Sequence, residues 1–499
     1  MHFASLTVDP AFRVGEVDPR LYGSFVEHLG RCVYEGIYEP GHPSADEHGF
    51  RADVASLTRE LGVPIVRYPG GNFVSGYDWE DGIGPVADRP TRIDLAWRTI
   101  EPNHVGVDEF QRWAGTVGAE TMMAVNLGTR GIDAARNFVE YCNHPAGTYW
   151  SDRRRANGAA DPYDIKVWCL GNEMDGPWQI GHKTAVEYGR LAAETGKAMR
   201  LVDPSIELVA CGSSNRAMPT FGSWEATVLA ETYDVADYVS LHAYYQERDG
   251  DRGSFLASAA DMDAFIEAVV ATADHVRAVG RHRKRINLSF DEWNVWYQTR
   301  FAGEENLAIE RTPRLIEDVY SVTDAVVVGN LLISLLRHAD RVRIGCQAQL
   351  VNVIGLIMTA PGGAAWRQSS YHPFALTSRH GRGTVLRLEP TSPVYETAVH
   401  GEVPVLDAVA VLADDADGVV LFAVNRDQEQ ELTLDVDARA LPSLGSAEHV
   451  ALFDEDPDAV NDEAHPDRVA PRLLDAPKLD SGRLQAVLPP LSWNMIRLS

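Results

Sequence analysis

The stretch IKVWCLGNE, residues 165–173, is an apolar run that ends abruptly in Gly-Asn-Glu. Seven similar runs begin at residues 21, 63, 121, 206, 238, 286 and 342, and nearly every run precedes a longer segment with helical periodicity. Candidate helices between them include 51–62, 185–202 and 261–280. Eight such alternations predict an α/β fold with parallel strands closed into a (β/α)8 TIM barrel. An open doubly wound sheet shares the same local signal and is the alternative.

The pattern changes after about residue 375, where helical periodicity gives way to short strands separated by Asp, Gly and Pro turns. Predicted strands begin at residues 384, 407, 418, 430, 448, 482 and 493. Leu432, Leu434 and Val436 alternate with polar residues, as in a strand with one buried face. We therefore expect a barrel over 18–374 and a C-terminal all-β sandwich of jelly-roll type over 375–499, completed by the first strand within 1–17.

The composition excludes several classes of protein. A formal net charge of -27 argues against binding to nucleic acid or to an anionic membrane surface. The five Cys are scattered through apolar runs, which predicts buried thiols, and no close ligand spacing indicates a metal site. The N-terminal segment lacks the pattern of a signal peptide, and no window reaches the length of a membrane span. We expect a cytoplasmic protein without a cofactor.

Two carboxylates stand at the ends of predicted strands: Glu173 closes the fourth strand and Glu292 the seventh. Functional residues of such barrels lie where strands end, around one shared mouth. Glycoside hydrolysis requires two carboxyl groups, of which one protonates the leaving oxygen while the other attacks the sugar or activates water. The pair therefore predicts a glycosidase with Glu173 as the acid, although either residue alone would suit a loop or a salt bridge.

The neighbouring polar residues suggest how the two glutamates differ. Strand alternation predicts that only one of Asp291 and Glu292 points inward, and we assign Glu292. Tyr244 is expected to donate a hydrogen bond to Glu292, and Arg67 to keep it ionised. His242 is placed with the substrate-binding residues, with an ordinary interior histidine as the alternative.

At these residues the chain resembles the α-L-arabinofuranosidases of glycoside hydrolase family 51. The resemblance spans nearly the whole chain and rests on motifs in a fixed order: LYGSFVEHLGRCVYEGIYEPG from 21, VRYPGGNFVSGYDWEDGIG from 66, LGNEMDGPWQIG from 170, LHAYY from 241, DEWNVWY from 291, AQLVNVIG from 348 and LPPLSWNMIRL from 488. It implies that Glu173 is the general acid/base and that Glu292 is the nucleophile of a retaining mechanism.

The resemblance also assigns supporting residues and an assembly. Residues that hold the furanose hydroxyls or orient the nucleophile would be Glu27, Arg67, Asn72, Asn172, Tyr244 and Gln349, with Trp97 and Trp178 near the entrance. A cytoplasmic hexamer acting on small oligosaccharides is implied as well. The expected activity is removal of terminal α-L-arabinofuranosyl groups from fragments of arabinan or arabinoxylan.

Two alternatives stay open. The first is a retaining barrel glycosidase for another sugar, such as a β-xylosidase or an endoglucanase. The second is a sugar-binding or sugar-sensing protein that has lost catalysis, which the presence of both glutamates disfavours. The sequence does not give the linkage preference, which depends on loops such as 295–317.

Overall fold

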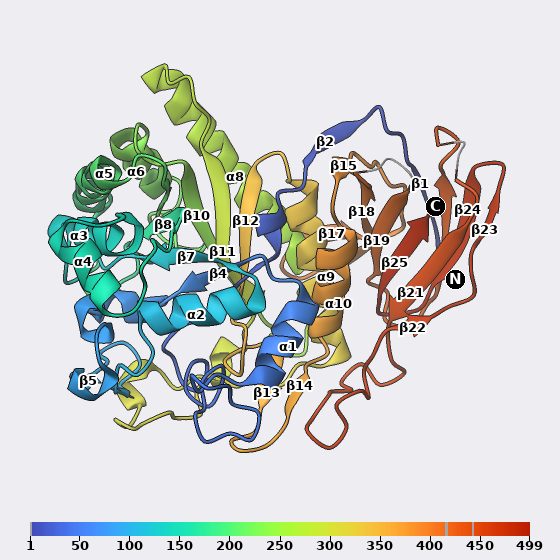
Figure 1. Cartoon of the computed structure of the whole chain (residues 1–499). Coiled ribbons are helices and arrows are strands. Elements are labelled where there is room, and N and C mark those ends of the chain that lie inside the picture. Colours follow the sequence, from blue (N-terminus) through green and yellow to red (C-terminus); the bar gives the residue numbers. More distant parts are fainter. Residues whose placement is uncertain (1, 415–417, 442–443) are drawn as a thin grey trace.

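Eight parallel strands form a closed barrel, seen in the left part of Figure 1. The computed structural model describes residues 2–414, 418–441 and 444–499, so the end of the predicted strand that begins at 407 lies outside the described residues from position 415. In chain order the barrel strands are β3 (Gly23–Phe25), β4 (Ile65–Tyr68), β7 (Glu120–Ala124), β8 (Val167–Leu170), β9 (Glu207–Ala210), β10 (Tyr238–Tyr245), β11 (Asn287–Val295) and β12 (Val342–Ala348). Each predicted run supplies one strand, which confirms the barrel over the open sheet.

Helices connect and cover these strands. They are α1 (Ala52–Leu61), α2 (Val107–Val117), α3 (Ile132–Asn143), α4 (Tyr149–Ala156), α5 (Ala185–Val202), α6 (Ser223–Thr232), α7 (Arg252–Leu256), α8 (Ser258–Gly280), α9 (Val322–Arg337) and α10 (Tyr371–His380). The three helices expected from periodicity correspond to α1, α5 and α8. Thr184 caps α5 by accepting a hydrogen bond from the backbone N–H of Glu187, and α1 ends where Gly62 takes the left-handed conformation.

The C-terminal strands form two further sheets, on the right of Figure 1. The seven-stranded sheet has the order β2 (Arg13–Glu16), β15 (Thr384–Leu386), β18 (Leu406–Leu412), β19 (Val419–Asn425), β25 (Ser492–Leu498), β21 (Ala447–Leu452) and β22 (Arg472–Leu473). The four-stranded sheet has the order β1 (His2–Thr7), β20 (Leu432–Asp437), β24 (Arg483–Leu488) and β23 (Lys478–Asp480). Strand β1 pairs in parallel with β20, with Ser5 opposite Asp435. Three two-stranded pairs complete the described strands: β5 (Arg92–Ile93) with β6 (Ile100–Glu101), β13 (Ile357–Thr359) with β14 (Ala365–Arg367), and β16 (Val394–Thr397) with β17 (Gly401–Pro404).

The seven-stranded sheet is apolar on both faces. On β18, Ala408 and Ala410 pack into the core between the two sheets, where Leu432 and Leu434 of β20 also lie. Val409 and Val411 point the other way and join the large core of the barrel. Helix α9, buried along nearly its whole length, lies between the barrel and this sheet (Figure 1). The two parts therefore share one apolar layer.

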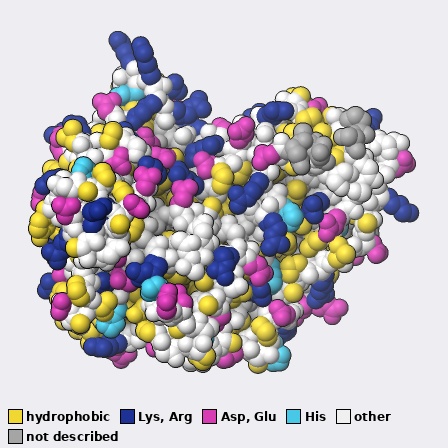
Figure 2. Space-filling model, viewed as in Figure 1, with side chains coloured by type: hydrophobic (Ala, Val, Ile, Leu, Met, Phe, Trp, Pro, Cys, Tyr) yellow, Lys and Arg dark blue, Asp and Glu magenta, His cyan; other side chains and the backbone are white. Residues whose placement is uncertain are grey.

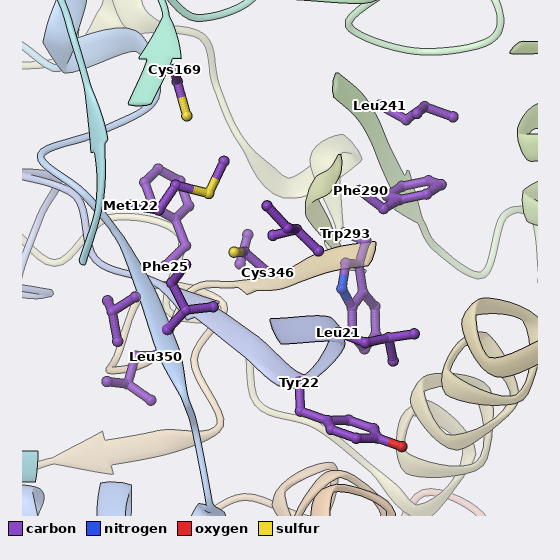
Figure 3. Close-up of a cluster of buried hydrophobic side chains, with 14 of the residues drawn as sticks. Leu21, Tyr22, Phe25, Met122, Cys169, Leu241, Phe290, Trp293, Cys346 and Leu350 are labelled. Atoms are coloured by element: carbon purple, nitrogen blue, oxygen red, sulfur yellow. The ribbon is translucent and has the colours of Figure 1, made fainter. Parts of the chain in front are cut away.

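The barrel core is built from side chains of several strands. Figure 3 draws Phe25 of β3, Met122 of β7, Phe290 of β11 and Cys346 of β12, all of them buried. The five cysteines are likewise buried and unpaired, as predicted. On the face shown in Figure 2, Asp and Glu side chains are interspersed with Lys and Arg. Among the described residues, none of the helices combines the length and apolarity that a bilayer crossing needs.

Candidate active site

Glu173 lies in a tight turn directly after β8. Gly171 has a φ of 91° and Glu173 itself a φ of 43°, so both take the left-handed conformation. This conformation is unfavourable for a residue with a side chain and is concentrated at functional sites. The turn explains why the apolar run ends in Gly-Asn-Glu: it directs the carboxyl group into the barrel mouth.

Two groups hold the Glu173 carboxyl group. His242 Nδ1 lies 2.8 Å from Oε1, and Trp178 Nε1 donates to Oε2 at 2.7 Å. Burial raises the pKa of Glu173 above its usual value, and the charge of Glu292 acts in the same direction. The hydrogen bonds from His242 and Trp178 oppose this shift. A carboxyl group with a raised pKa retains its proton and suits a general acid.

Glu292 is held by the two residues expected from the sequence. Arg67 Nη1 donates to Oε1 at 2.6 Å, and the Tyr244 hydroxyl donates to Oε2 at 2.8 Å. Arg67 Nη2 also donates to Asn172 Oδ1 at 2.7 Å, which ties the turn after β8 to the end of β11. One oxygen of Glu173, one oxygen of Glu292 and one ring nitrogen of His242 all lie within 4.8 Å of one another. The two carboxyl groups therefore face a single space.

The prediction that only one of Asp291 and Glu292 points inward was wrong. His242 Nε2 lies 2.9 Å from Asp291 Oδ1, and its Nδ1 lies 3.6 Å from Glu292 Oε2. The pairing of β11 shifts register against both neighbours, between Ser240 and His242 on β10 and between Phe290 and Trp293 on its β12 side. Such irregularities interrupt alternation and bring two consecutive side chains to one face. Asp291 was missed as a site residue, although its position beside Glu292 was a signal.

His242 lies between the carboxyl groups of Glu173 and Asp291. Burial alone would lower its pKa, but the carboxylates of Glu292, Asp291 and Glu173 outweigh burial and raise the pKa to about 10. Its two ring nitrogens lie within hydrogen-bonding distance of Glu173 and Asp291, so the protonation of His242 and that of Glu173 depend on each other. Glu173, His242 and Glu292 have the donor types and the spacing of a set of metal ligands, but each of them already has a hydrogen-bonding partner within the site.

A cavity of about 1220 Å³ opens above these groups. Residues lining it include Glu27, Asn72, Trp97, Glu173, Trp178, Tyr244, Glu292 and Gln349. Arg67, Asn172 and His242 are buried and are not among the lining residues; Arg67 and His242 contact the glutamates, and Asn172 contacts Arg67. Glu27 accepts hydrogen bonds from the backbone of Phe73 at 3.0 Å, from Trp97 Nε1 at 2.9 Å and from Gln349 Nε2 at 3.1 Å. Burial raises the pKa of Glu27 to about 8, although the hydrogen bonds from Phe73 and Trp97 act to lower it.

The two tryptophans of the lining differ in exposure. Trp178 is 43% exposed at the cavity, whereas Trp97 is only 5% exposed. Trp97 still lines the cavity, and its exposure is low because its indole N–H donates to Glu27 and its backbone N–H donates to Asp94 at 2.7 Å. The sequence also did not reveal the far part of the lining, which comes from segments 214–217, 245–261 and 398–400.

A (β/α)8 barrel with two glutamates facing one cavity defines the class of the protein as a barrel glycoside hydrolase. Family models for the α-L-arabinofuranosidase 1 domain and the α-L-arabinofuranosidase C-terminal domain match residues 57–264 and 291–492. The chain is 57% identical to the intracellular exo-α-(1→5)-L-arabinofuranosidase of Halalkalibacterium halodurans, covering 99% of both chains. It belongs to the α-L-arabinofuranosidase family.

Two further relatives show the range of the family. The chain is 50% identical to an exo-α-(1→6)-L-arabinofuranosidase of Bifidobacterium longum, covering 99% of this chain and 97% of the relative. The solved structure of a family 51 α-L-arabinofuranosidase from the same organism superimposes with a TM-score of 0.95 at 48% identity, covering 99% of each chain. The fold expected from the resemblance is thereby confirmed.

Proposed function

We propose that this protein hydrolyses terminal non-reducing α-L-arabinofuranosyl groups of arabinose-containing oligosaccharides with retention of configuration. The observation that carries the proposal is the approach of Glu173 and Glu292 within 4.8 Å, oxygen to oxygen. Retaining glycosidases place their carboxyl groups about 5 to 5.5 Å apart, whereas inverting enzymes need about 6.5 to 9.5 Å to admit a water molecule. The observed spacing supports direct attack by a carboxylate.

In the first step, a Glu292 oxygen attacks the anomeric carbon while Glu173 gives its proton to the glycosidic oxygen. The glycosidic bond breaks, and a covalent arabinosyl ester of Glu292 forms. Arg67 and Tyr244 orient the attacking carboxylate, since each binds one of its oxygens. The leaving alcohol departs neutral because it has taken the acid proton.

In the second step, Glu173 acts as a base. Water gives a proton to Glu173 and attacks the same carbon from the side that the leaving group has left, which breaks the ester and frees Glu292. The proton taken from this water restores the acid form of Glu173 for the next cycle. Two inversions at one carbon give net retention. Glu27, Asn72 and Gln349, which line the buried side of the cavity, supply acceptors and donors for the sugar hydroxyls.

The first experiment measures nitrophenol release from 4-nitrophenyl α-L-arabinofuranoside by wild type, Glu173→Ala and Glu292→Ala. We expect a loss of about 10³-fold or more in kcat/KM for Glu292→Ala, and in kcat for Glu173→Ala, because nitrophenol leaves without the acid but water still needs the base. Azide should rescue Glu173→Ala alone and give an arabinosyl azide of retained configuration. An azide product of inverted configuration would overturn the retaining mechanism.

A panel of nitrophenyl glycosides and polysaccharides separates the alternatives. Turnover of xylosides or of polymeric glucans in preference to arabinofuranosides would favour another barrel glycosidase. Binding of arabino-oligosaccharides by wild type without turnover would favour a binding protein. Among arabinofuranosides we propose α-1,5-linked oligomers as substrates, because the relative from H. halodurans carries that linkage in its name. Because the relative from B. longum is named for the α-1,6 linkage, the α-1,6-linked arabinose dimer is the substrate to compare with the α-1,5-linked dimer.

We also propose an intracellular location, supported by the names of relatives such as that from H. halodurans, and a hexamer, supported by the family resemblance. Light scattering after size exclusion tests the hexamer.

The proposed division into a barrel over 18–374 and a sandwich over 1–17 and 375–499 is supported by the membership of β1, β2 and β15 in the sandwich sheets. Limited proteolysis that cuts near residue 375 would test this boundary.

A further inference from the structure

The cavity has two sides with different origins. Glu27, Asn72 and Gln349 follow β3, β4 and β12, which are neighbours in the barrel. The opposite side is formed after β8, β9 and β10, also neighbours, by Trp178 and by the segments 214–217 and 245–261. The turn 398–400 between β16 and β17 completes this second side, which we call the outer arm.

The chemistry assigns one side to each part of a substrate. The sugar that forms the ester must lie against Glu292, within reach of the buried polar groups around Glu27. The leaving group must lie beside Glu173, because this residue protonates the oxygen that departs. Glu173 follows β8 and contacts Trp178, so the leaving group extends toward the outer arm.

The turn 398–400 is fixed against the barrel by two hydrogen bonds. The Tyr395 hydroxyl donates to the Gly253 carbonyl at 2.9 Å, and the Val399 backbone N–H donates to Ser254 Oγ at 3.3 Å. Both acceptors belong to α7, which lies in the segment that follows β10. The side chain of Val399 is 71% exposed, although its backbone is anchored. A hairpin distant in sequence is thus held at the cavity wall.

The outer arm carries groups suited to a neutral, hydroxyl-rich ligand. Arg216 Nη1 donates to Asp261 Oδ1 at 2.7 Å, and the Tyr245 hydroxyl donates to Asp261 Oδ2 at 3.3 Å. Guanidinium and carboxylate groups retain unused donors and acceptors in such a pair. His400 is half-buried, and burial lowers its pKa, so its neutral ring offers one donor and one acceptor. The pair has no net charge, as a neutral sugar requires.

We propose that the outer arm binds the second and later arabinofuranosyl units of an oligosaccharide, with Arg216, Asp261 and His400 as its polar contacts. This inference deepens the proposed function and rests on it. The hairpin β16–β17 makes the sandwich part of the substrate site. Chain-length preference therefore depends on residues outside the barrel as well as on the barrel loops.

The test compares kcat/KM for α-1,5-arabinotetraose with kcat/KM for 4-nitrophenyl α-L-arabinofuranoside, which has no later sugar units. We expect the ratio of the two values to fall about tenfold in Arg216→Ala and in His400→Ala, because each loses polar contacts made only by the longer ligand. The control Arg190→Ala removes an exposed arginine that lies on α5, outside the cavity lining, and should leave the ratio at its wild-type value. An unchanged ratio in both cavity variants would overturn the proposal.

A binding measurement separates this proposal from the proposed function. Calorimetry of arabinotetraose with Glu173→Gln should give an affinity that falls about tenfold when Arg216→Ala is added. If this holds while wild type turns over no arabinofuranoside, the proposed hydrolysis is wrong and the proposed binding by the outer arm is supported. If nitrophenyl substrate is hydrolysed but the added substitution leaves tetraose affinity unchanged, the arm is wrong and the reaction stands. If neither turnover nor binding is found, both are overturned.

Discussion

Glu173 is subject to opposing influences that set how firmly it holds its proton. Burial and the charge of Glu292 raise its pKa, whereas His242 and Trp178 stabilise the ionised form. Asp291 influences Glu173 indirectly, because it binds the second ring nitrogen of His242. The acid is therefore tuned by neighbours rather than by burial alone, and each neighbour can be removed separately.

Replacing Trp178 by Phe removes the indole N–H that binds Glu173 Oε2. This donor favours the charged carboxylate, so its loss raises the pKa of Glu173 further. General acid catalysis requires the protonated form, and activity is lost as the pH rises through this pKa. We therefore expect the alkaline limb of the kcat/KM profile to move up by about half to one pH unit. Profiles measured with an α-1,5-linked arabino-oligosaccharide, whose leaving alcohol needs the proton of Glu173, check this prediction.

The control for Trp178→Phe is Trp150→Phe, because Trp150 packs against Trp79 and does not line the cavity. Its profile should keep the wild-type alkaline limb. A move of the Trp178→Phe limb to lower pH would mean that the indole does not stabilise the carboxylate.

Sequence reasoning reached the residues that end regular strands and missed those that depend on irregular geometry. Glu173 and Glu292 are visible because each interrupts an apolar run. Asp291 was set aside by the alternation rule, which the register shifts of β11 break. The low exposure of Trp97 accompanies a hydrogen bond to Glu27, a residue 70 positions away, which the local sequence pattern does not encode.

At the scale of elements, the sequence pattern predicted strands and helices well because the barrel strands are continuous apolar runs buried on both faces, whereas helices such as α1 bury one face. Helix α9 shows a different case, since its residues 322–336 are buried all round. An apolar segment without a polar face carries no amphipathic signal, so its partners could not be read from the sequence. The structure places it between the barrel and the seven-stranded sheet (Figure 1).

Two helical glycines give a matched test of this packing. A Cβ at Gly329 of α9 would lie 2.8 Å from Trp493 Nε1 and closer still to Cδ1, whereas a Cβ at Gly115 of α2 would meet nothing within 4 Å. We expect Gly329→Ala to lower the free energy of unfolding by about 1 to 3 kcal/mol through overpacking. Gly115→Ala should raise it by about 0.5 to 1 kcal/mol, because alanine is the better helix former.

Urea unfolding of both glycine variants beside wild type measures these changes. The opposite signs are the essential result, since helix propensity alone predicts stabilisation at both sites. Stabilisation by Gly329→Ala would show that Trp493 moves aside readily and that the contact between α9 and β25 is loose.

For the whole molecule, the sequence predicted two parts but not their connection. The change in periodicity near residue 375 marks the change of architecture, and β1 was expected beside the C-terminal strands. The contribution of the hairpin β16–β17 to the cavity was not predicted, because it depends on contacts between Tyr395 or Val399 and a helix about 145 residues earlier. Long-range docking of this kind leaves no periodic trace in either segment.

A buried polar network also joins the two parts. Asp407 of β18 accepts hydrogen bonds from Arg426 Nη2 at 2.7 Å and from Asn330 Nδ2 at 2.8 Å, and it pairs with Arg337 at the end of α9. Arg426 also donates to Asn330 Oδ1 at 2.7 Å. The Arg426 side chain is only 3% exposed, so it depends on these partners in place of water.

Asp407→Ala should therefore leave the buried Arg426 without its carboxylate and lower the free energy of unfolding by about 3 kcal/mol. Asp407→Asn keeps an acceptor oxygen but loses the charge, and should fall between this variant and wild type. The control Glu194→Ala breaks an exposed helical pair with Lys197 and should change stability by less than about 1 kcal/mol. Urea unfolding followed by tryptophan fluorescence measures all three. If Asp407→Ala loses no more than the control, the apolar layer around α9, and not the polar network, holds the sandwich against the barrel.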